Sequence, residues 1–282
     1  PFMGNKKVAL VTGGSSGIGM GIALELAGKG YDIAFTYRNN AEGASAVAAQ
    51  IEALGAACRF YQIAVEKLES CAALVDRVHA DFGRIDAMVC NAASDRRFSI
   101  LTAKPENFLY MTSQLYSAQM LLAGAAARHM VKSGIHGGIL FITSIHGQMI
   151  TTNDFLYGGM KAAIERSCKS LALELSPYRI RVNCIAPGAI NVRHQDDAQR
   201  KYPYFTMVPL GRWGVEADIG RAAAFLLSDE ADYITGETLR VDGGFALPGV
   251  PEGWAEPHPV DTRFVQAAYE QMLKNEEETD NG

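Results

Sequence analysis

Short apolar runs alternate with longer alanine-rich stretches along most of this 282-residue chain, and that order limits the folds it can adopt. Seven runs have the composition of strands: KVALVT, DIAFTY, CRFYQIAV, IDAMVC, GILFIT, RVNCI and TLRV. Most are continuously apolar, as strands buried on both faces are. Helices are predicted between them, over residues 17–29, 41–54, 67–82, 105–132, 154–176 and 216–228. The pattern predicts right-handed β-α-β crossovers and one doubly wound α/β domain, a parallel sheet of about seven strands with helices on both faces.

The composition changes near residue 247, and no linker interrupts the pattern before that point. Residues 1–247 are therefore predicted to form one domain. The stretch ALPGVPEGWAEPHPVD is rich in Pro and Gly, which favours irregular chain. A short helix in TRFVQAAYEQMLK and a frayed acidic tail are expected after it. We interpret residues 248–282 as a C-terminal extension that covers a neighbouring subunit or caps the active site.

Charge and cysteine usage narrow the functional classes. The net charge of −5, with no Lys/Arg-rich block, argues against a nucleic-acid partner. No apolar run approaches the roughly 18–20 residues that span a bilayer, and the first residues lack the layout of a signal peptide. The five cysteines are scattered without a C-x-x-C pair, which argues against a disulfide framework or a metal site. They are interpreted as core residues of a cytoplasmic protein.

A strand leads directly into a glycine-rich turn and a helix in VALVTGGSSGIG, residues 8–19. Gly13 can adopt the tight turn, while Gly17 and Gly19 let the backbone approach a diphosphate or let the helix pack closely on the sheet. The helix N-terminus presents free N–H groups and the positive end of its dipole to phosphate. The turn predicts a dinucleotide site that includes Gly13, Ser15, Ser16, Gly17, Ile18 and Gly19.

Tyr157 and Lys161 stand four positions apart in FLYGGMK, so both point to the same side of a predicted helix. They form either a core aromatic beside a surface lysine or an acid/base pair. A free tyrosine has a pKa of about 10, which a nearby ammonium lowers because it favours the phenolate. Ser144 ends the strand GGILFITS, at the sheet edge where α/β proteins bind ligands, and can donate to a carbonyl. Together these residues favour proton transfer.

The ordered motifs resemble those of the short-chain dehydrogenase/reductase family, in its compact single-domain form. The resemblance runs from about Asn5 to Leu247 and rests on T-G-x-x-x-G-x-G, CNAA at 90–93, Ser144, Tyr157 with Lys161, NCIAPG at 183–188 and ITGETLRVDGG at 234–244. It implies a Rossmann-like fold and an oxidoreductase that interconverts a ketone and a secondary alcohol by hydride transfer. In that family the residues matching Ser144, Tyr157 and Lys161 are catalytic, and the lysine also holds the nicotinamide ribose.

The resemblance also implies where the rest of the cofactor lies. Asn91 and Ala92 follow the fourth strand beside it, and Pro187, Gly188 and Ile190 turn the chain beneath the nicotinamide. Relatives usually form tetramers, so a homotetramer acting on a small carbonyl or alcohol is expected. Sugars or polyols, 3-oxoacyl thioesters and steroid-like alcohols all stay open as substrates.

The second strand indicates which dinucleotide is bound. An acid at its end takes the ribose hydroxyls of NAD, whereas an arginine suits the 2′-phosphate of NADP. Here DIAFTYRNN ends in Tyr37, Arg38 and Asn39, with no acid. Arginine can donate twice to a phosphate through its planar fork. NADP(H) is therefore predicted over NAD(H).

Four positions depart from the family pattern. Gln114, or Leu115 with a one-residue uncertainty in alignment, stands where relatives carry a catalytic Asn. The remaining departures are Ala64 or Val65 in place of an adenine-contacting acid, Val192 in place of a Thr, and Ala93 in place of a Gly. They motivate an alternative function, a dinucleotide-binding redox sensor or scaffold with little catalysis.

Two loops near the predicted site contain polar residues for which the sequence allows two interpretations. His146 is interpreted either as an exposed loop residue or as a substrate contact. Asp95, Arg96 and Arg97 are interpreted as a solvated turn; the alternative is that they bind a polar or anionic substrate. Residues 191–212 match the family's substrate lid in position.

Overall fold

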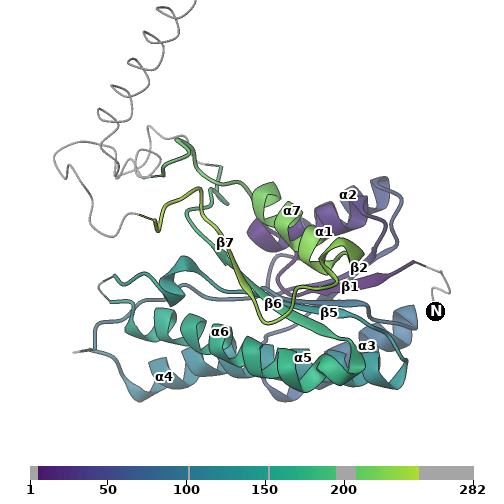
Figure 1. Ribbon diagram of the computed structural model, residues 1–282, viewed down its shortest axis with the longest axis horizontal. Coiled ribbons are helices and arrows are strands. Elements are labelled where there is room, and N and C mark those ends of the chain that lie inside the picture. Colours follow the sequence, from purple (N-terminus) through teal and green to yellow (C-terminus); the bar gives the residue numbers. More distant parts are fainter. Residues whose placement is uncertain (1–5, 101, 152, 195–207, 248–282) are drawn as a thin grey trace, which may run out of the picture.

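Seven parallel strands form a single sheet in the computed structural model, which describes residues 6–100, 102–151, 153–194 and 208–247 (Figure 1). The strands are β1 (Val8–Val11), β2 (Asp32–Tyr37), β3 (Cys58–Gln62), β4 (Ala87–Cys90), β5 (Gly138–Ile142), β6 (Arg181–Pro187) and β7 (Thr238–Val241). Their spatial order is β3-β2-β1-β4-β5-β6-β7, and every pair is parallel. The chain reverses direction across the sheet between β1 and β4. The predicted doubly wound α/β fold is confirmed.

Helices cover both faces of this sheet (Figure 1). On one face lie α1 (Gly17–Gly28), α2 (Ala41–Ala53) and α7 (Glu216–Leu227), whose apolar sides share one hydrophobic cluster with the strands. On the other lie α3 (Glu69–Phe82), α5 (Ala118–Lys132) and α6 (Phe155–Leu175), which share a second cluster. The short α4 (Pro105–Thr112) precedes α5. The apolar faces of the helices thus pack against the sheet, as the sequence pattern predicts.

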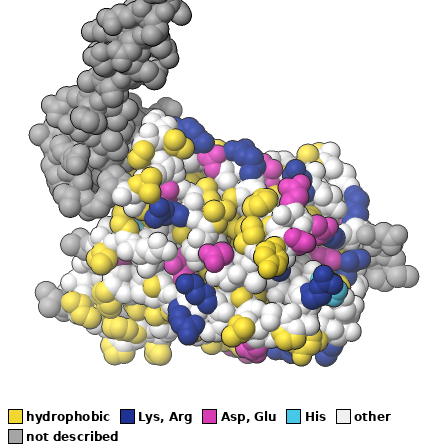
Figure 2. Space-filling view, in the orientation of Figure 1, with side chains coloured by type: hydrophobic (Ala, Val, Ile, Leu, Met, Phe, Trp, Pro, Cys, Tyr) yellow, Lys and Arg dark blue, Asp and Glu magenta, His cyan; other side chains and the backbone are white. Residues whose placement is uncertain are grey.

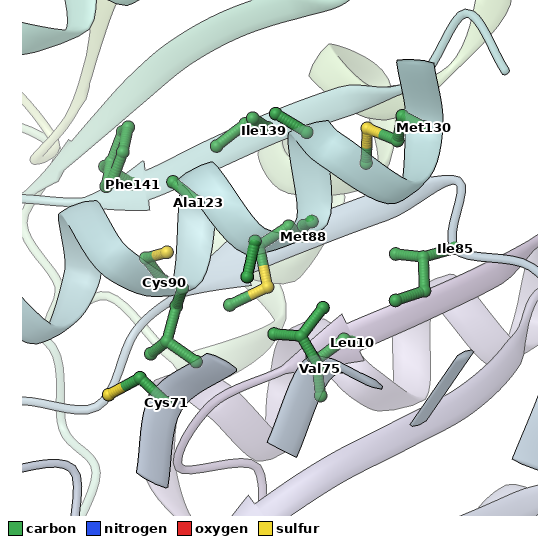
Figure 3. Packing of buried hydrophobic residues seen from close by; sticks show 14 of the residues in the cluster. Leu10, Cys71, Val75, Ile85, Met88, Cys90, Ala123, Met130, Ile139 and Phe141 are labelled. Atoms are coloured by element: carbon green, nitrogen blue, oxygen red, sulfur yellow. The ribbon is translucent and has the colours of Figure 1, made fainter. Parts of the chain in front are cut away.

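Strand β4 shows why the strand runs are continuously apolar. Met88 and Cys90 belong to the cluster under α3 and α5, where they lie close to Val75 and Ala123 (Figure 3). Their neighbour Val89 belongs to the opposite cluster. Because successive side chains point to opposite faces and both faces are covered, no position of the strand meets water.

The edge strand β3 and the predicted helix 105–132 differ from expectation. Strand β3 ends at Gln62, earlier than predicted, and Tyr61 is its one buried residue, since β3 is an edge of the sheet that the described residues form. The long helix is interrupted by one π-helical turn, η1 (Ser113–Ser117), between α4 and α5. Such turns occur mostly at functional sites, and this one borders the predicted catalytic residues.

Within the described part of the chain, no helix is long and apolar enough to cross a membrane. The helix predicted near residue 265, the acidic tail and most of the segment matching the substrate lid lie outside the described residues.

Candidate active site

A cavity of about 650 Å³ lies at the carboxyl ends of the central strands, near the point where the strand order reverses. Doubly wound sheets bind their ligands at this place. Its lining includes most of the predicted site residues: Gly13, Ser15, Ser16, Gly17, Ile18, Gly19, Tyr37, Arg38, Asn91, Ala92, Gln114, Ser144, Tyr157, Lys161, Pro187 and Gly188. Asn39 and Ile190 are not part of the lining. The side chain of Ile190 instead packs on the core and against Gly214.

The glycine-rich turn between β1 and α1 is shaped for a close ligand. Gly13 and Gly17 adopt φ of +68° and +53°, where side chains are strained. A Cβ on Gly19 would lie 2.2 Å from the carbonyl oxygen of Gly13, so only glycine permits this packing of helix on turn. No side chain caps the first N–H groups of α1, and no acid stands in its first turn. The uncapped N-terminus beside the cavity fits the diphosphate of a dinucleotide.

Asn91 ties β4 to β1 at the cavity floor. Its Nδ2 donates to the carbonyl oxygen of Thr12 at 2.9 Å, and its backbone N–H donates to Thr12 Oγ1 at 2.9 Å. The backbone N–H of Ala92 donates to the same hydroxyl at 3.0 Å. Asn91 therefore fixes the spacing of β1 and β4 at the point where the glycine-rich turn follows β1.

Ser144, Tyr157 and Lys161 meet at the other end of the cavity. Lys161 is 1% exposed, and its Nζ donates to the carbonyl oxygen of Ile142 at 2.8 Å and lies 5.7 Å from the ring centre of Tyr157. Burial lowers the pKa of Lys161 to about 8. Burial also raises the pKa of Tyr157, while the hydrogen bond with Ser144 and the charge of Arg97 oppose the rise. Desolvation thus outweighs these two influences, which favour the phenolate.

Gln114 and Leu115, the two candidates for the position of the family Asn, lie in the π-turn η1 but in different surroundings. Gln114 lines the cavity and is buried, and its Oε1 has no hydrogen-bond partner in the described part of the protein. Leu115 packs instead with Met111 and Leu156 in a small apolar cluster. Gln114 is therefore the residue with a free polar group toward the catalytic end.

Arg38 at the end of β2 is held by two residues that the sequence did not indicate. It forms an ion pair with Glu66, and its Nη1 lies 3.4 Å from the hydroxyl of Tyr110. Both partners line the cavity. The family pattern places an acid after β3, at the position of Ala64 or Val65. Glu66 lies one residue further along the chain, and its side chain reaches Arg38 at the end of β2. Its place next to the expected position is the sequence signal that could have identified it.

Known proteins resemble this chain over most of its length. A family model described as enoyl-(acyl carrier protein) reductase matches residues 13–246. The chain belongs to the short-chain dehydrogenase/reductase family. It is 34% identical to the uncharacterized oxidoreductase YohF of Escherichia coli K12, over 86% of this chain and 96% of that one. It is 37% identical to the 3-oxoacyl-[acyl-carrier-protein] reductase FabG of the same organism, over 86% and 98%.

Among solved structures, acetoin dehydrogenase from Enterobacter cloacae matches with a TM-score of 0.81 at 34% identity, covering 86% of this chain and 96% of that one. The protein is thus an oxidoreductase of the short-chain dehydrogenase/reductase type, a family that binds a nicotinamide dinucleotide. The resemblance predicted from the motifs is confirmed.

A group of charged residues beside Tyr157 extends the family site. The loop after β4 brings Arg97 to Asp154, whose Oδ1 lies 3.1 Å from Nη1. Asp154 Oδ2 lies 2.7 Å from Nδ1 of His146. Arg97 is exposed, as the interpretation of a solvated turn requires, but it also pairs with the buried Asp154, and His146 is only partly exposed. Asp154, three residues before Tyr157, was missed because an acid at the start of a helix is usually a cap.

Proposed function

We propose that this protein is an NADP(H)-dependent oxidoreductase that interconverts a ketone and a secondary alcohol by hydride transfer, with Tyr157 as acid/base. The observation that carries the proposal is the cavity that Ser144, Tyr157 and Lys161 share with the glycine-rich turn. The cavity connects a helix N-terminus that suits phosphate with a half-buried proton donor, Tyr157. The lysine supports the donor from the same helix, one turn away.

The cofactor supplies the hydride when bound, and the residues supply the proton. In the reductive direction the hydroxyl of Tyr157 donates its proton to the carbonyl oxygen as the carbon accepts the hydride. Ser144 has one hydroxyl proton: donated to the substrate oxygen, it orients that oxygen, and donated to Tyr157, it favours the phenolate left behind. The buried ammonium of Lys161 acts in the same direction because it stabilises negative charge nearby. Gln114 has a free Oε1 with which to order a water that returns the proton.

The preference for NADP(H) is supported by the charge at the end of β2. Arg38 lines the cavity with its guanidinium half exposed, and no acid stands at the end of the strand. Glu66 neutralises Arg38 in the protein as described. A 2′-phosphate, with its higher charge and three acceptor oxygens, can compete with that carboxylate for the guanidinium.

The substrate is proposed to be a small ketone or alcohol. The names of two relatives, acetoin dehydrogenase and 3-oxoacyl-[acyl-carrier-protein] reductase, supply the first compounds to try. A panel of hydroxyketones, 3-oxoacyl thioesters, sugars and steroid-like alcohols covers the open classes. An enoyl thioester belongs in the panel because of the description of the matching family model.

The test is the consumption of NADPH, followed by its absorbance, with each compound in turn. Turnover by the native protein and its loss in Tyr157→Phe, by about 10³-fold or more, is the expected result, since the variant lacks the proton donor. NADPH binding measured by fluorescence should survive the substitution. Tight NADPH binding without turnover on the whole panel would instead favour a redox sensor or scaffold.

We further propose a homotetramer in the cytoplasm. All five cysteines are free thiols, which suits a reducing compartment. Hydrophobic side chains gather on the surface around α4 and α6 (Figure 2). A groove of about 400 Å³, lined largely by apolar residues of α5 and α6, crosses that side of the sheet. Both features favour contact with another copy of the chain.

A further inference from the structure

Four residues from two loops are linked to one another near Tyr157. They are Arg97 from the loop after β4, and His146, Thr151 and Asp154 from the connection between β5 and α6; we call them the Arg97 cluster. The guanidinium carbon of Arg97 lies 5.5 Å from the ring centre of Tyr157. The imidazole of His146 meets the same ring edge-on, at 6.1 Å between centres. The catalytic tyrosine proposed above thus has two cations within 6 Å of its ring centre, Lys161 and Arg97.

The position of Arg97 is fixed by several contacts. Nη1 pairs with Asp154 at 3.1 Å and donates to Thr151 Oγ1 at 3.1 Å. Nη2 lies 3.4 Å from Nε2 of His146, whose other nitrogen contacts Asp154. Asp154 is only 4% exposed, so its carboxylate gains much from a charged partner. An arginine in a free surface turn would not meet a buried acid, a hydroxyl and two rings at once.

The charges that face Tyr157 come from three segments. Lys161 and Asp154 lie on α6 or at its start, Ser144 and His146 on the connection after β5, and Asp95 and Arg97 on the loop after β4. Burial is the largest influence and raises the pKa of Tyr157. The hydrogen bond of Ser144 and the charge of Arg97 lower it, whereas Asp95 and Asp154 raise it. His146 contributes a charge only when it is protonated.

Lys161 does not supply a constant charge to this site. Its pKa of about 8 means that the ammonium loses its proton in mildly alkaline solution, where the oxidation of alcohols is favoured by the release of a proton. A guanidinium keeps its charge throughout that range, because its pKa exceeds about 12. Arg97 is the cation near Tyr157 that does not titrate with Lys161.

We propose that Arg97 is a positioning residue that acts through Tyr157: a second cation near the ring, anchored by Asp154, that stabilises the phenolate together with Lys161. The proposal rests on the proposed function only in taking Tyr157 as the acid/base. It adds a residue outside the serine–tyrosine–lysine set. The loop after β4 would then help to determine the pH range in which the enzyme is active.

The test is a direct titration of Tyr157, which needs neither cofactor nor substrate. The ultraviolet difference signal of tyrosinate, native protein minus Tyr157→Phe, isolates this residue from the other tyrosines. Arg97→Gln and Arg97→Met both remove the charge, and each should move the midpoint to higher pH by about one unit, since the pair is partly exposed to water. Arg97→Lys keeps a charge there and should move the midpoint by less than half as much. Arg221→Gln, which removes an arginine paired with Asp218 far from the cavity, should not move it.

Kinetics supply the second measurement. In Arg97→Gln the ionisation seen in the pH profile of kcat/KM should move by the same amount as the titration, while the KM for NADPH stays within about twofold of native. A native midpoint in both charge-removing variants, or an equal shift in Arg97→Lys, would overturn the proposal. Absence of turnover on every ketone would defeat the proposed function but leave the titration to decide the role of Arg97.

Discussion

At the scale of single residues, the site sets two effects against each other. Burial penalises the charged form of Lys161 and the charged form of Tyr157, yet the proposed catalysis uses both. The motif spacing predicts that the two side chains share a side of α6, which is what the structure has. It does not predict how dry the surroundings are, because that depends on residues distant in the sequence. The pKa directions could therefore be obtained only from the fold.

Lys161→Met should stabilise the protein at neutral pH. A fall of the lysine pKa from 10.5 to about 8 corresponds to a destabilisation of about 3 kcal/mol, of which the lost hydrogen bond to Ile142 offsets about 1. The folded state binds fewer protons than the unfolded state between these two values. The destabilisation is therefore complete below about pH 8 and disappears as the pH rises toward 10.5.

Urea unfolding at pH 7 and pH 10 measures this effect. The variant should be more stable than native by about 2 kcal/mol at the lower pH and nearly equal at the higher pH, with its activity reduced. A gain that is the same at both values would show that the lysine charge is not its source.

Arg38→Ala should raise the KM for NADPH by about 10- to 100-fold, because a charged contact to phosphate contributes about 1.5–3 kcal/mol. The KM for NADH should change by less than about threefold, since NADH lacks the 2′-phosphate. Glu66→Gln is the matched variant: it removes the carboxylate that neutralises Arg38, so the KM for NADPH should fall. Equal effects of Arg38→Ala on the two cofactors would refute NADP(H) preference.

At the scale of elements, the sequence predicted most of the scaffold and less of the site. Strands β2 and β7 agree with the predicted runs. Strand β2 is buried and leaves a simple apolar signal, whereas no residue of the edge strand β7 is buried. The π-turn at 113–117 was not predicted, since SQLYS has an ordinary helical composition and the turn depends on packing against α6. The Arg97–Asp154 pair joins residues from two different loops and leaves no local pattern.

The two glycines of FLYGGMK, Gly158 and Gly159, differ in the space around them. A Cβ on Gly158 would lie 2.6 Å from the backbone oxygen of His146, whereas a Cβ on Gly159 meets nothing within 4 Å. Gly158→Ala should therefore cost about 1–3 kcal/mol, because backbone cannot move aside easily. Gly159→Ala should gain about 0.5–1 kcal/mol from helix propensity. Chemical denaturation of the pair checks both signs, and a neutral Gly158→Ala would mean that helix α6 is free to shift.

At the scale of the whole molecule, the α5–α6 side of the sheet has both an apolar groove and exposed apolar side chains. Tyr178 lines the groove and is 50% exposed, and Leu121 on α5 and Leu173 on α6 are 45% and 78% exposed. Single exposed leucines are common, but exposed apolar side chains on the two helices that line an apolar groove favour an interface. The proposed tetramer would bury them against a second copy of the chain.

Leu173→Arg should therefore break the assembly. An arginine from each of two copies would place like charges in an apolar contact. The free-energy cost of desolvating them would exceed the stabilisation from the buried apolar surface. Light scattering coupled to size exclusion should give the mass of four chains for the native protein and a smaller mass for the variant. Leu54→Arg, on α2 at the opposite face and 52% exposed, is the control and should keep the native mass. A native mass in Leu173→Arg, or a monomeric native protein, would exclude this face as the interface, and the active site would then have to be complete within one chain.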